Sequence, residues 1–165
     1  MLSRIHRRLE DGLRLIQVRD RDLPRREAFV RDVVRAAHRF GARVLVSGGS
    51  PLADGAHFTA AQLMALHERP ASGLAAASCH DAAELSRAMT LGLDFAVLGP
   101  VRPTATHPEG RPLGLDGFAR LVRGASIPVY AVGGMTRSDL ESVWRAGGHG
   151  VAMITGAWPV VRNGV

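Results

Sequence analysis

Short apolar runs alternate along the chain with longer segments that have a helical period. The runs are rich in Val, Leu, Ile and Ala, and those with the length of a strand cover residues 13–19, 43–47, 55–58, 74–80, 95–99, 128–134 and 150–155. This alternation is typical of repeated βα units around a parallel sheet. The pattern therefore predicts an α/β fold in which each strand is followed by a helix.

Three of the intervening segments have clear helix signals, and they cover residues 24–41, 81–92 and 137–148. The apolar face of the first contains Phe29, Val33, Val34, Ala37 and Phe40. This segment ends at Gly41, a common C-terminal residue of helices. The second begins at Asp81 and has Glu84 three residues later, the spacing of a capping box.

Successive βα units favour a (β/α)8 barrel over an open sheet, because no strand is followed by a G-x-G-x-x-G turn. We predict a single barrel domain over residues 1–165. Two irregularities make the barrel incomplete. The chain opens with a helical segment where a first strand is expected, and residues 47–55 are shorter than the dozen or so of a parallel crossover. Either one crossover is contracted, or residues of a longer chain are missing.

Composition excludes several classes of protein. Hydrophobic residues make up 46% of the chain and charged residues 22%, which fits one globular domain. No run approaches the roughly 18 apolar residues of a membrane helix. No signal-peptide core follows the charged N-terminal segment, so we expect a cytoplasmic protein. The single cysteine, Cys79, cannot form an internal disulfide or a thiolate zinc site, and we expect it to pack in the core.

All 21 basic residues are arginines. They are spread along the chain with little aromatic interleaving, which argues against nucleic-acid binding as the explanation of the net charge of +6. Without lysine, a Schiff base or a phosphate-loop lysine is excluded. Any bound phosphate must be held by arginine, backbone amides, hydroxyls or a metal.

In such a barrel the ligand site lies where the strands end. The site residues that we predict at these ends are Gln17, Arg19, Arg21, Ser78, His80, Thr104, Thr106, His107, Gly133, Gly134, Thr155 and Gly156. Two of the segments, A-V-G-G-M and M-I-T-G-A-W, occupy the units where barrels commonly hold a phosphate on backbone amides at the start of a helix.

The order of three motifs is specific: S-C-H at 78–80, G-P-V-R-P-T-A-T at 99–106 and A-V-G-G at 131–134. With them, nearly the whole chain resembles the thiamine phosphate synthase and TenI superfamily of (β/α)8 barrels. The resemblance implies that the segments named above bind a pyrimidine diphosphate and a thiazole phosphate. Within them, Gln17, Arg19, Ser78, Thr104, Thr106, Gly133, Gly134 and Thr155 would take the family's binding roles.

The sequence departs from that family at its metal-binding positions. An Asn-Asp pair is replaced by Ser47-Gly48, and a Gly-Gln-x-Asp segment by residues 59–62, Thr-Ala-Ala-Gln. Two family lysines are replaced by Arg21 and His107. The resemblance thus implies magnesium while its carboxylate ligands are absent, which argues against efficient coupling of the two substrates.

The TenI thiazole tautomerases do not need the metal, and the resemblance places their acid–base histidine at His80. An imidazole that titrates near neutrality is suited to moving a proton. The chain also resembles the barrel domain fused to Nudix hydrolases, so a fused or separate Nudix domain is a predicted partner, although these residues contain no Nudix box. A homo-oligomer in which a second chain fills the place of the first strand is another hypothesis.

Three functions stay open from the sequence: a synthase-like or tautomerase-like enzyme, a non-catalytic domain that binds a phosphorylated heterocycle, and a nucleic-acid binder. Several residues also have a structural alternative. His57 fits a buried structural histidine as well as a ligand contact. Gln17 and Arg19 fit a core ion pair, for instance of Arg19 with a buried carboxylate, as well as a binding site. Gly133 and Gly134 fit a tight turn, although close approach to a phosphate explains them better.

Overall fold

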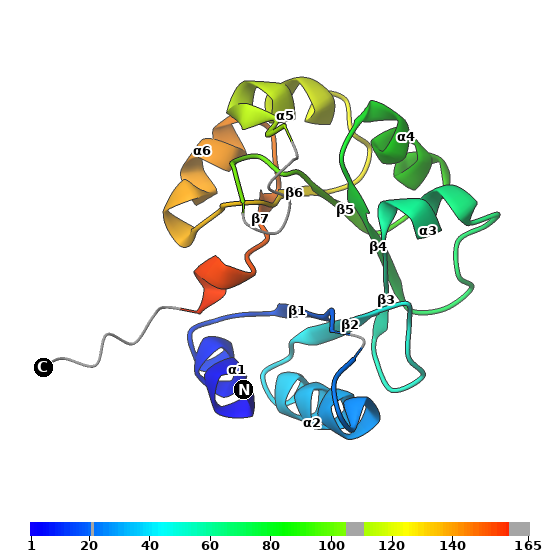
Figure 1. The fold of residues 1–165 in the computed structure, drawn as a ribbon, viewed down its shortest axis with the longest axis vertical. Coiled ribbons are helices and arrows are strands. Elements are labelled where there is room, and N and C mark those ends of the chain that lie inside the picture. Colours follow the sequence, from blue (N-terminus) through cyan, green and yellow to red (C-terminus); the bar gives the residue numbers. More distant parts are fainter. Residues whose placement is uncertain (21, 105–110, 159–165) are drawn as a thin grey trace, which may run out of the picture. The chain divides into compact units, whose positions relative to one another are not determined.

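The computed structural model describes residues 1–20, 22–104 and 111–158 (Figure 1). The chain forms two compact units, Met1–Ala76 and Ala77–Val165. A single domain over residues 1–165 stays a prediction. No helix in the described residues is long and apolar enough to cross a membrane.

Unit 1 is built on three parallel strands and the start of a fourth. Its elements are α1 (Leu2–Glu10), β1 (Leu15–Val18), α2 (Arg26–His38), β2 (Arg43–Ser47), β3 (Gly55–Phe58), α3 (Ala60–Ala65) and the first residues of β4 (Leu74–Cys79). The strands lie side by side in chain order. Both β1–β2 and β2–β3 are parallel, with Val18 opposite Val46 and Ser47 opposite His57.

Unit 2 continues the same pattern from the end of β4. Its elements are α4 (Ala82–Thr90), β5 (Phe95–Leu98), α5 (Gly114–Val122), β6 (Val129–Ala131), the 3-10 turn η1 (Arg137–Asp139), α6 (Leu140–Arg145), β7 (Gly150–Val151) and the 3-10 turn η2 (Thr155–Ala157). Strands β5, β6 and β7 also follow chain order and pair in parallel. The predicted α/β fold with parallel strands is therefore confirmed.

The predicted strand boundaries hold for β2 and β3, whereas β6 and β7 are shorter than predicted, and the run 150–155 contributes only Gly150–Val151 to the sheet. The apolar run 128–134 contributes only Val129–Ala131 to the sheet. Gly133 and Gly134 have φ angles of +92° and +64°, a left-handed conformation that is incompatible with an extended strand. Strand β6 therefore ends just before the glycine pair.

The contracted crossover between β2 and β3 is confirmed, and its register explains why it needs no helix. Strand β3 pairs only with the last three residues of β2, from Leu45 to Ser47. The chain must therefore return over only two residues of strand, about 7 Å. Residues 48–54 cover that distance as a turn.

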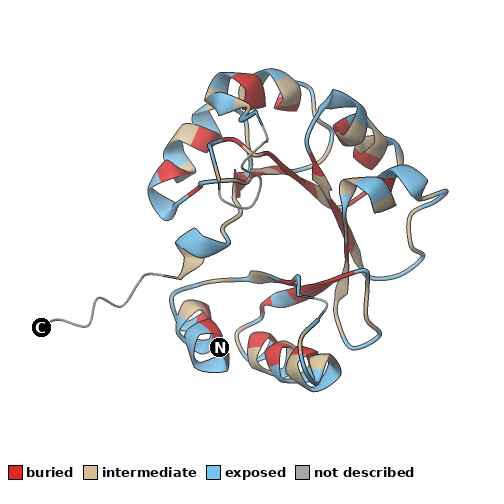
Figure 2. Ribbon diagram, in the orientation of Figure 1, coloured by how far each residue is buried: buried red, intermediate tan, exposed pale blue. Residues whose placement is uncertain are grey.

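Each unit buries apolar residues on its strands and on one face of its helices (Figure 2). In unit 1, α2 packs on β2 and buries Val30, Val33 and Ala37. In unit 2, α5 buries Phe118, the largest fully buried side chain described. The predicted face of α2 is thus confirmed for Val33 and Ala37, and Val30 is a further member.

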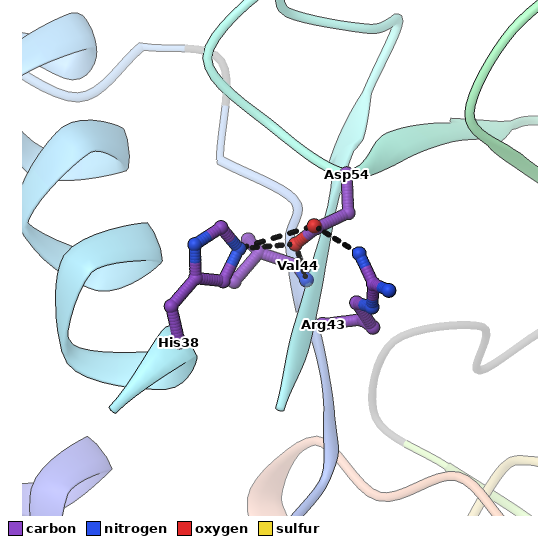
Figure 3. A network of polar contacts seen from close by, with 4 residues as sticks. All are labelled: His38, Arg43, Val44 and Asp54. Carbon is purple, nitrogen blue, oxygen red and sulfur yellow. Dashed lines mark hydrogen bonds and ion pairs between the residues drawn. The ribbon is translucent and has the colours of Figure 1, made fainter. Parts of the chain in front are cut away.

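Asp54 ties the contracted crossover to the N-terminal end of β2 (Figure 3). Its carboxylate accepts hydrogen bonds from the Val44 backbone N–H at 2.8 Å and from Arg43 Nη1 at 2.9 Å, and it contacts His38 Nε2 at 3.0 Å. Burial opposes ionisation and by itself raises the pKa of Asp54. The hydrogen bonds from Val44, His38 and Arg43 outweigh burial and hold this pKa below 3.8.

Replacing Asp54 with Asn is expected to lower the free energy of unfolding by about 1–2 kcal/mol at pH 7. Because the pKa of Asp54 is lowered by folding, its ionised form stabilises the native state above about pH 4. That stabilisation is lost as the pH falls through the folded pKa, so the wild type and Asp54→Asn should converge in acid. Urea unfolding from pH 7 to pH 3 measures this, with the exposed Asp32→Asn on α2 as the control. Equal pH dependence in Asp54→Asn and the wild type would refute the role of Asp54.

Candidate functional site

Unit 1 gathers polar side chains where β1, β2 and β3 end. Gln17 on β1 donates a hydrogen bond from Nε2 to Ser47 Oγ on β2 at 3.0 Å. Ser47 pairs with His57 in the parallel register, so the two side chains are on the same face of the sheet. Ser47 is 7% exposed and His57 is 4% exposed. We call Gln17, Arg19, Ser47 and His57 the polar layer of unit 1.

Arg19 and His57 interact electrostatically within the polar layer. Burial lowers the pKa of His57, and the nearby positive charge of Arg19 lowers it further, to about 4. His57 is therefore a neutral imidazole at neutral pH, and Arg19 supplies the positive charge of the layer. The sequence left His57 open between a structural and a ligand-binding role. The structure places it among the predicted site residues, in a buried position.

The free energy of unfolding should depend on pH through His57. Its pKa falls from about 6.5 in the unfolded chain to about 4 in the folded one. As the pH decreases from 7 to 4, the unfolded state binds the proton before the folded state does. The free energy of unfolding therefore decreases over this range, by on the order of 3 kcal/mol in total. Unfolding curves at pH 7, 6, 5 and 4 should show this loss in the wild type and a smaller one in His57→Gln. The same loss in both proteins would show that another group carries it.

Arg26, at the start of α2, links the ends of β1 and β2. Its Nη2 donates to the Ser47 carbonyl at 3.0 Å, and its Nε donates to the Asp20 carbonyl at 3.2 Å. Arg26 is not recognisable as a site residue from the sequence, because an arginine near a helix start is common on solvated surfaces. Its hydrogen bond to the Ser47 carbonyl shows that it reaches the polar layer.

The residues at the family's magnesium positions do not fit the ion. Magnesium prefers carboxylate and other oxygen ligands. At the end of β2 the chain offers Ser47, whose hydroxyl accepts the Gln17 hydrogen bond. At the start of α3, Thr59 and Gln62 form a capping box, with the Thr59 N–H donating to Gln62 Oε1 at 3.0 Å. Among the described residues, no cluster of three or more His, Cys, Asp or Glu side chains is placed to hold a metal.

In unit 2, β4 ends in Ser78 and Cys79, and His80 follows it. Ser78 is half-buried and His80 is exposed, whereas Cys79 points into the core and is 1% exposed. Burial raises the pKa of the Cys79 thiol to about 12, and the negative charges of Glu84 and Asp81 contribute. The predicted core position of Cys79 is confirmed, and its thiol is not a nucleophile at neutral pH.

His80 is paired with Glu84 on the first turn of α4. Glu84 Oε2 lies 3.0 Å from His80 Nδ1 and accepts the His80 backbone N–H at 2.6 Å. The predicted capping box between Asp81 and Glu84 is thus only half right. Asp81 accepts the Glu84 N–H at 2.9 Å, but the Glu84 carboxylate turns one residue further back, to His80. An ionised carboxylate gains more from two donors on His80 than from one backbone N–H.

Gly133 and Gly134 lie against the segment that follows β5. A Cβ atom at Gly133 would lie 2.7 Å from Pro100, and one at Gly134 would lie 2.8 Å from Arg102 Cβ. The backbones are also hydrogen-bonded, with the Arg102 N–H donating to the Gly133 carbonyl at 3.1 Å. Close packing of two loops therefore requires both glycines. Their contact with a phosphate stays a prediction that this geometry permits.

Gly156 approaches the same loop from the end of the described chain. A Cβ atom at Gly156 would lie 2.6 Å from the Met135 carbonyl oxygen. The structure thus brings three of the four predicted phosphate-binding residues to neighbouring turns, and Thr155 adjoins Gly156 in η2. We call Gly133, Gly134, Thr155 and Gly156 the glycine cradle. The predicted helix after β7 is, in the described residues, only the 3-10 turn Thr155–Ala157.

Asp139 connects the glycine cradle to the segment after β5. Its Oδ1 accepts a hydrogen bond from Arg102 Nη2 at 2.5 Å. Its Oδ2 accepts from the Thr136 N–H at 2.8 Å and from Thr136 Oγ1 at 2.7 Å. Burial would raise the pKa of Asp139, but the bonds from Thr136 and the charge of Arg102 together lower it. The sequence analysis missed Arg102 and Asp139. Their separation of 37 residues gives no local signal of this pairing.

The remaining predicted site residues have less structural detail. Thr104 is half-buried after β5. Arg21, Thr106 and His107 lie outside the described residues.

The comparisons with known proteins agree with the motifs and the fold. The family model described as "Thiamine monophosphate synthase" matches residues 1–157. The chain belongs to the thiamine monophosphate synthase family. The family resemblance carried by the motifs is thereby confirmed.

Relatives in this family are similar over nearly the whole chain. The thiamine-phosphate synthase of Myxococcus xanthus is 34% identical over 95% of this chain and 77% of the relative. That of Caldivirga maquilingensis is 30% identical over 90% of this chain and 77% of the relative. Among solved structures, a thiamine phosphate pyrophosphorylase from Pyrococcus furiosus is similar with a TM-score of 0.77. It is 24% identical over 93% of this chain and 79% of that one, and the likeness therefore supports the fold.

Proposed function

We propose that this member of the thiamine monophosphate synthase family works in thiamine biosynthesis on a thiazole phosphate, and that His80 moves a proton on the thiazole. The observation that carries the proposal is the pairing of His80 Nδ1 with Glu84 Oε2 at 3.0 Å, where β4 ends. A carboxylate that holds one ring nitrogen of a histidine is a common arrangement of acid–base sites. The family and its relatives supply the substrate class.

The pairing defines which nitrogen of His80 exchanges protons. When Nδ1–H donates to Glu84, the neutral imidazole carries its lone pair on Nε2. In a tautomerisation, Nε2 would take a proton from a ring carbon of the heterocycle and return one to another carbon of the same conjugated system, outside the ring. No atom is gained or lost, and Glu84 stabilises the imidazolium formed between the two transfers. Glu84 is thus a positioning residue for His80.

Coupling to a pyrimidine diphosphate fits the described residues less well. Departure of pyrophosphate requires strong neutralisation of negative charge. Ser47 and Gly48 stand where the family resemblance implies carboxylates for magnesium, and Gln62 is engaged in the capping box of α3. We therefore propose proton transfer as the chemistry of this chain.

The glycine cradle is the proposed site of the phosphate group. Its backbone N–H groups and the Thr155 hydroxyl can donate hydrogen bonds to phosphate oxygens. Gly134, Thr155 and Gly156 are exposed, so a ligand can reach them.

Titration calorimetry of the full chain with thiazole phosphate, with magnesium and with EDTA, tests the proposal. We expect binding of equal affinity in both conditions, followed by turnover of a non-aromatic tautomer. Binding without turnover would instead indicate a non-catalytic ligand-binding domain. Binding only with magnesium, or no binding, would contradict the proposal.

Other features of the family resemblance stay predictions. They are a Nudix partner, a homo-oligomer, a cytoplasmic location, and closure of the strands into a (β/α)8 barrel.

A further inference from the structure

Arg102 directly contacts the glycine cradle. Its backbone N–H donates to the Gly133 carbonyl at 3.1 Å, and its Cβ lies 2.8 Å from where a Cβ at Gly134 would be. The next residue, Pro103, has its carbonyl oxygen 3.1 Å from the same position. The backbone from which the Arg102 side chain extends is therefore fixed against both glycines.

Asp139 holds the guanidinium of Arg102. The Asp139 side chain is 8% exposed, and its second oxygen is fixed by the two hydrogen bonds from Thr136. Arg102 Nη2 binds the first oxygen, while 47% of the Arg102 side chain is exposed. An arginine has five N–H donors in a planar fork, so one edge can bind a carboxylate while another faces a ligand.

The glycine cradle itself contains no cation that would balance the charge of a phosphate ester. A phosphate monoester carries between one and two negative charges near neutral pH. Gly133, Gly134, Thr155 and Gly156 offer only backbone amides and one hydroxyl. The chain has no lysine, since its 21 basic residues are all arginines. Arg102 is an arginine that its hydrogen bond to Gly133 and its packing on Gly134 place against this loop.

We propose that Arg102 is a phosphate-binding residue of the glycine cradle and that Asp139 positions its guanidinium. The inference rests on the proposed function, because it takes the cradle as the site of the phosphate group. Two N–H groups of Arg102 would donate to phosphate oxygens, as paired guanidinium–phosphate contacts do. Asp139 acts through Arg102 and does not touch the ligand.

Calorimetric titration with inorganic phosphate, thiazole phosphate and the phosphate-free thiazole alcohol tests the role of Arg102. Replacing Arg102 with Gln should weaken both phosphate-bearing ligands by about tenfold or more, and Arg102→Lys should weaken them less, as expected for one charge-assisted contact. Affinity for the alcohol should be unchanged. The control is Arg145→Gln, which removes a positive charge that is also paired with a carboxylate, Glu141, on the exposed face of α6.

Replacing Asp139 with Asn tests the positioning role. The variant should lose affinity for phosphate-bearing ligands and keep it for the alcohol, and Asp139→Glu should restore part of the loss. A merely structural role would weaken all ligands together. Circular dichroism melting shows whether each variant is folded. If Asp139→Asn does not fold, the titrations of the Arg102 variants decide the proposal, because the Arg102 side chain is exposed.

The outcomes separate this inference from the proposed function. If the wild type binds neither inorganic phosphate nor thiazole phosphate, both are overturned. If the wild type binds and Arg102→Gln binds equally well, only the role of Arg102 is overturned. An equal loss in Arg102→Gln and Arg145→Gln would also overturn it, because the effect would then reflect net charge.

Discussion

Replacing His80 with Gln is expected to slow conversion of a thiazole phosphate tautomer by about 10²- to 10⁴-fold, the usual contribution of a positioned acid–base group. Glutamine keeps a hydrogen-bonding side chain beside Glu84 but cannot exchange a proton near neutral pH. Binding of the product should change little, because the proposed phosphate site, the glycine cradle, lies elsewhere in unit 2. Initial rates followed by ultraviolet absorbance, with binding measured separately, give both quantities.

Two further variants show whether the loss is specific to the His80–Glu84 pair. Glu84→Gln should reduce the rate by about tenfold, because an amide does not stabilise the imidazolium as a carboxylate does. His149→Gln is the matched control, since His149 is exposed and lies just before β7, at the opposite end of a strand from the site. An unchanged rate in His80→Gln would remove His80 from the chemistry.

Replacing Gly55 with Ala is expected to be among the most destabilising single changes in unit 1. A Cβ atom at Gly55 would lie 2.0 Å from the Leu74 carbonyl oxygen and 2.6 Å from its carbonyl carbon. Both are backbone atoms of the neighbouring strand, so relief requires the strand itself to move. We expect a loss of about 3 kcal/mol or more in the free energy of unfolding, measured in urea.

Gly41→Ala separates steric overlap from backbone strain. Gly41 has a φ angle of +65°, and a Cβ atom there would meet nothing within 4 Å. Alanine at this position should cost only about 1–2 kcal/mol, the penalty of a left-handed conformation. If Gly55→Ala destabilised the protein no more than Gly41→Ala, this result would contradict the close approach of Gly55 to the Leu74 backbone.

The sequence predicts the fold well because hydrophobic periodicity and helix ends are local signals. Strands β2 and β3 have their predicted boundaries, and the contracted crossover at residues 48–54 is visible as a segment too short for a helix. The predicted length of β6 fails because apolar character continues past Ala131, while the backbone of Gly133 turns away from the strand. Periodicity reports burial and does not report the φ angle.

The site is predicted in part, for a related reason. Strand ends and motifs point to Gln17 in unit 1 and to His80 and the glycine cradle in unit 2. They do not reveal which side chains pair. Glu84 has the spacing of a capping box, yet its carboxylate binds His80. The pairing of Arg102 with Asp139 depends on how two loops pack, and no local pattern encodes it.

The most direct test of the account is the conversion of a non-aromatic thiazole phosphate tautomer by the wild type in EDTA, followed by ultraviolet absorbance. We predict catalysed conversion at a rate unaffected by the chelator, since the proposed proton transfer uses His80 and Glu84 alone. No conversion in EDTA, together with formation of thiamine phosphate when magnesium and a pyrimidine diphosphate are added, would contradict the account and assign metal-assisted coupling to the chain.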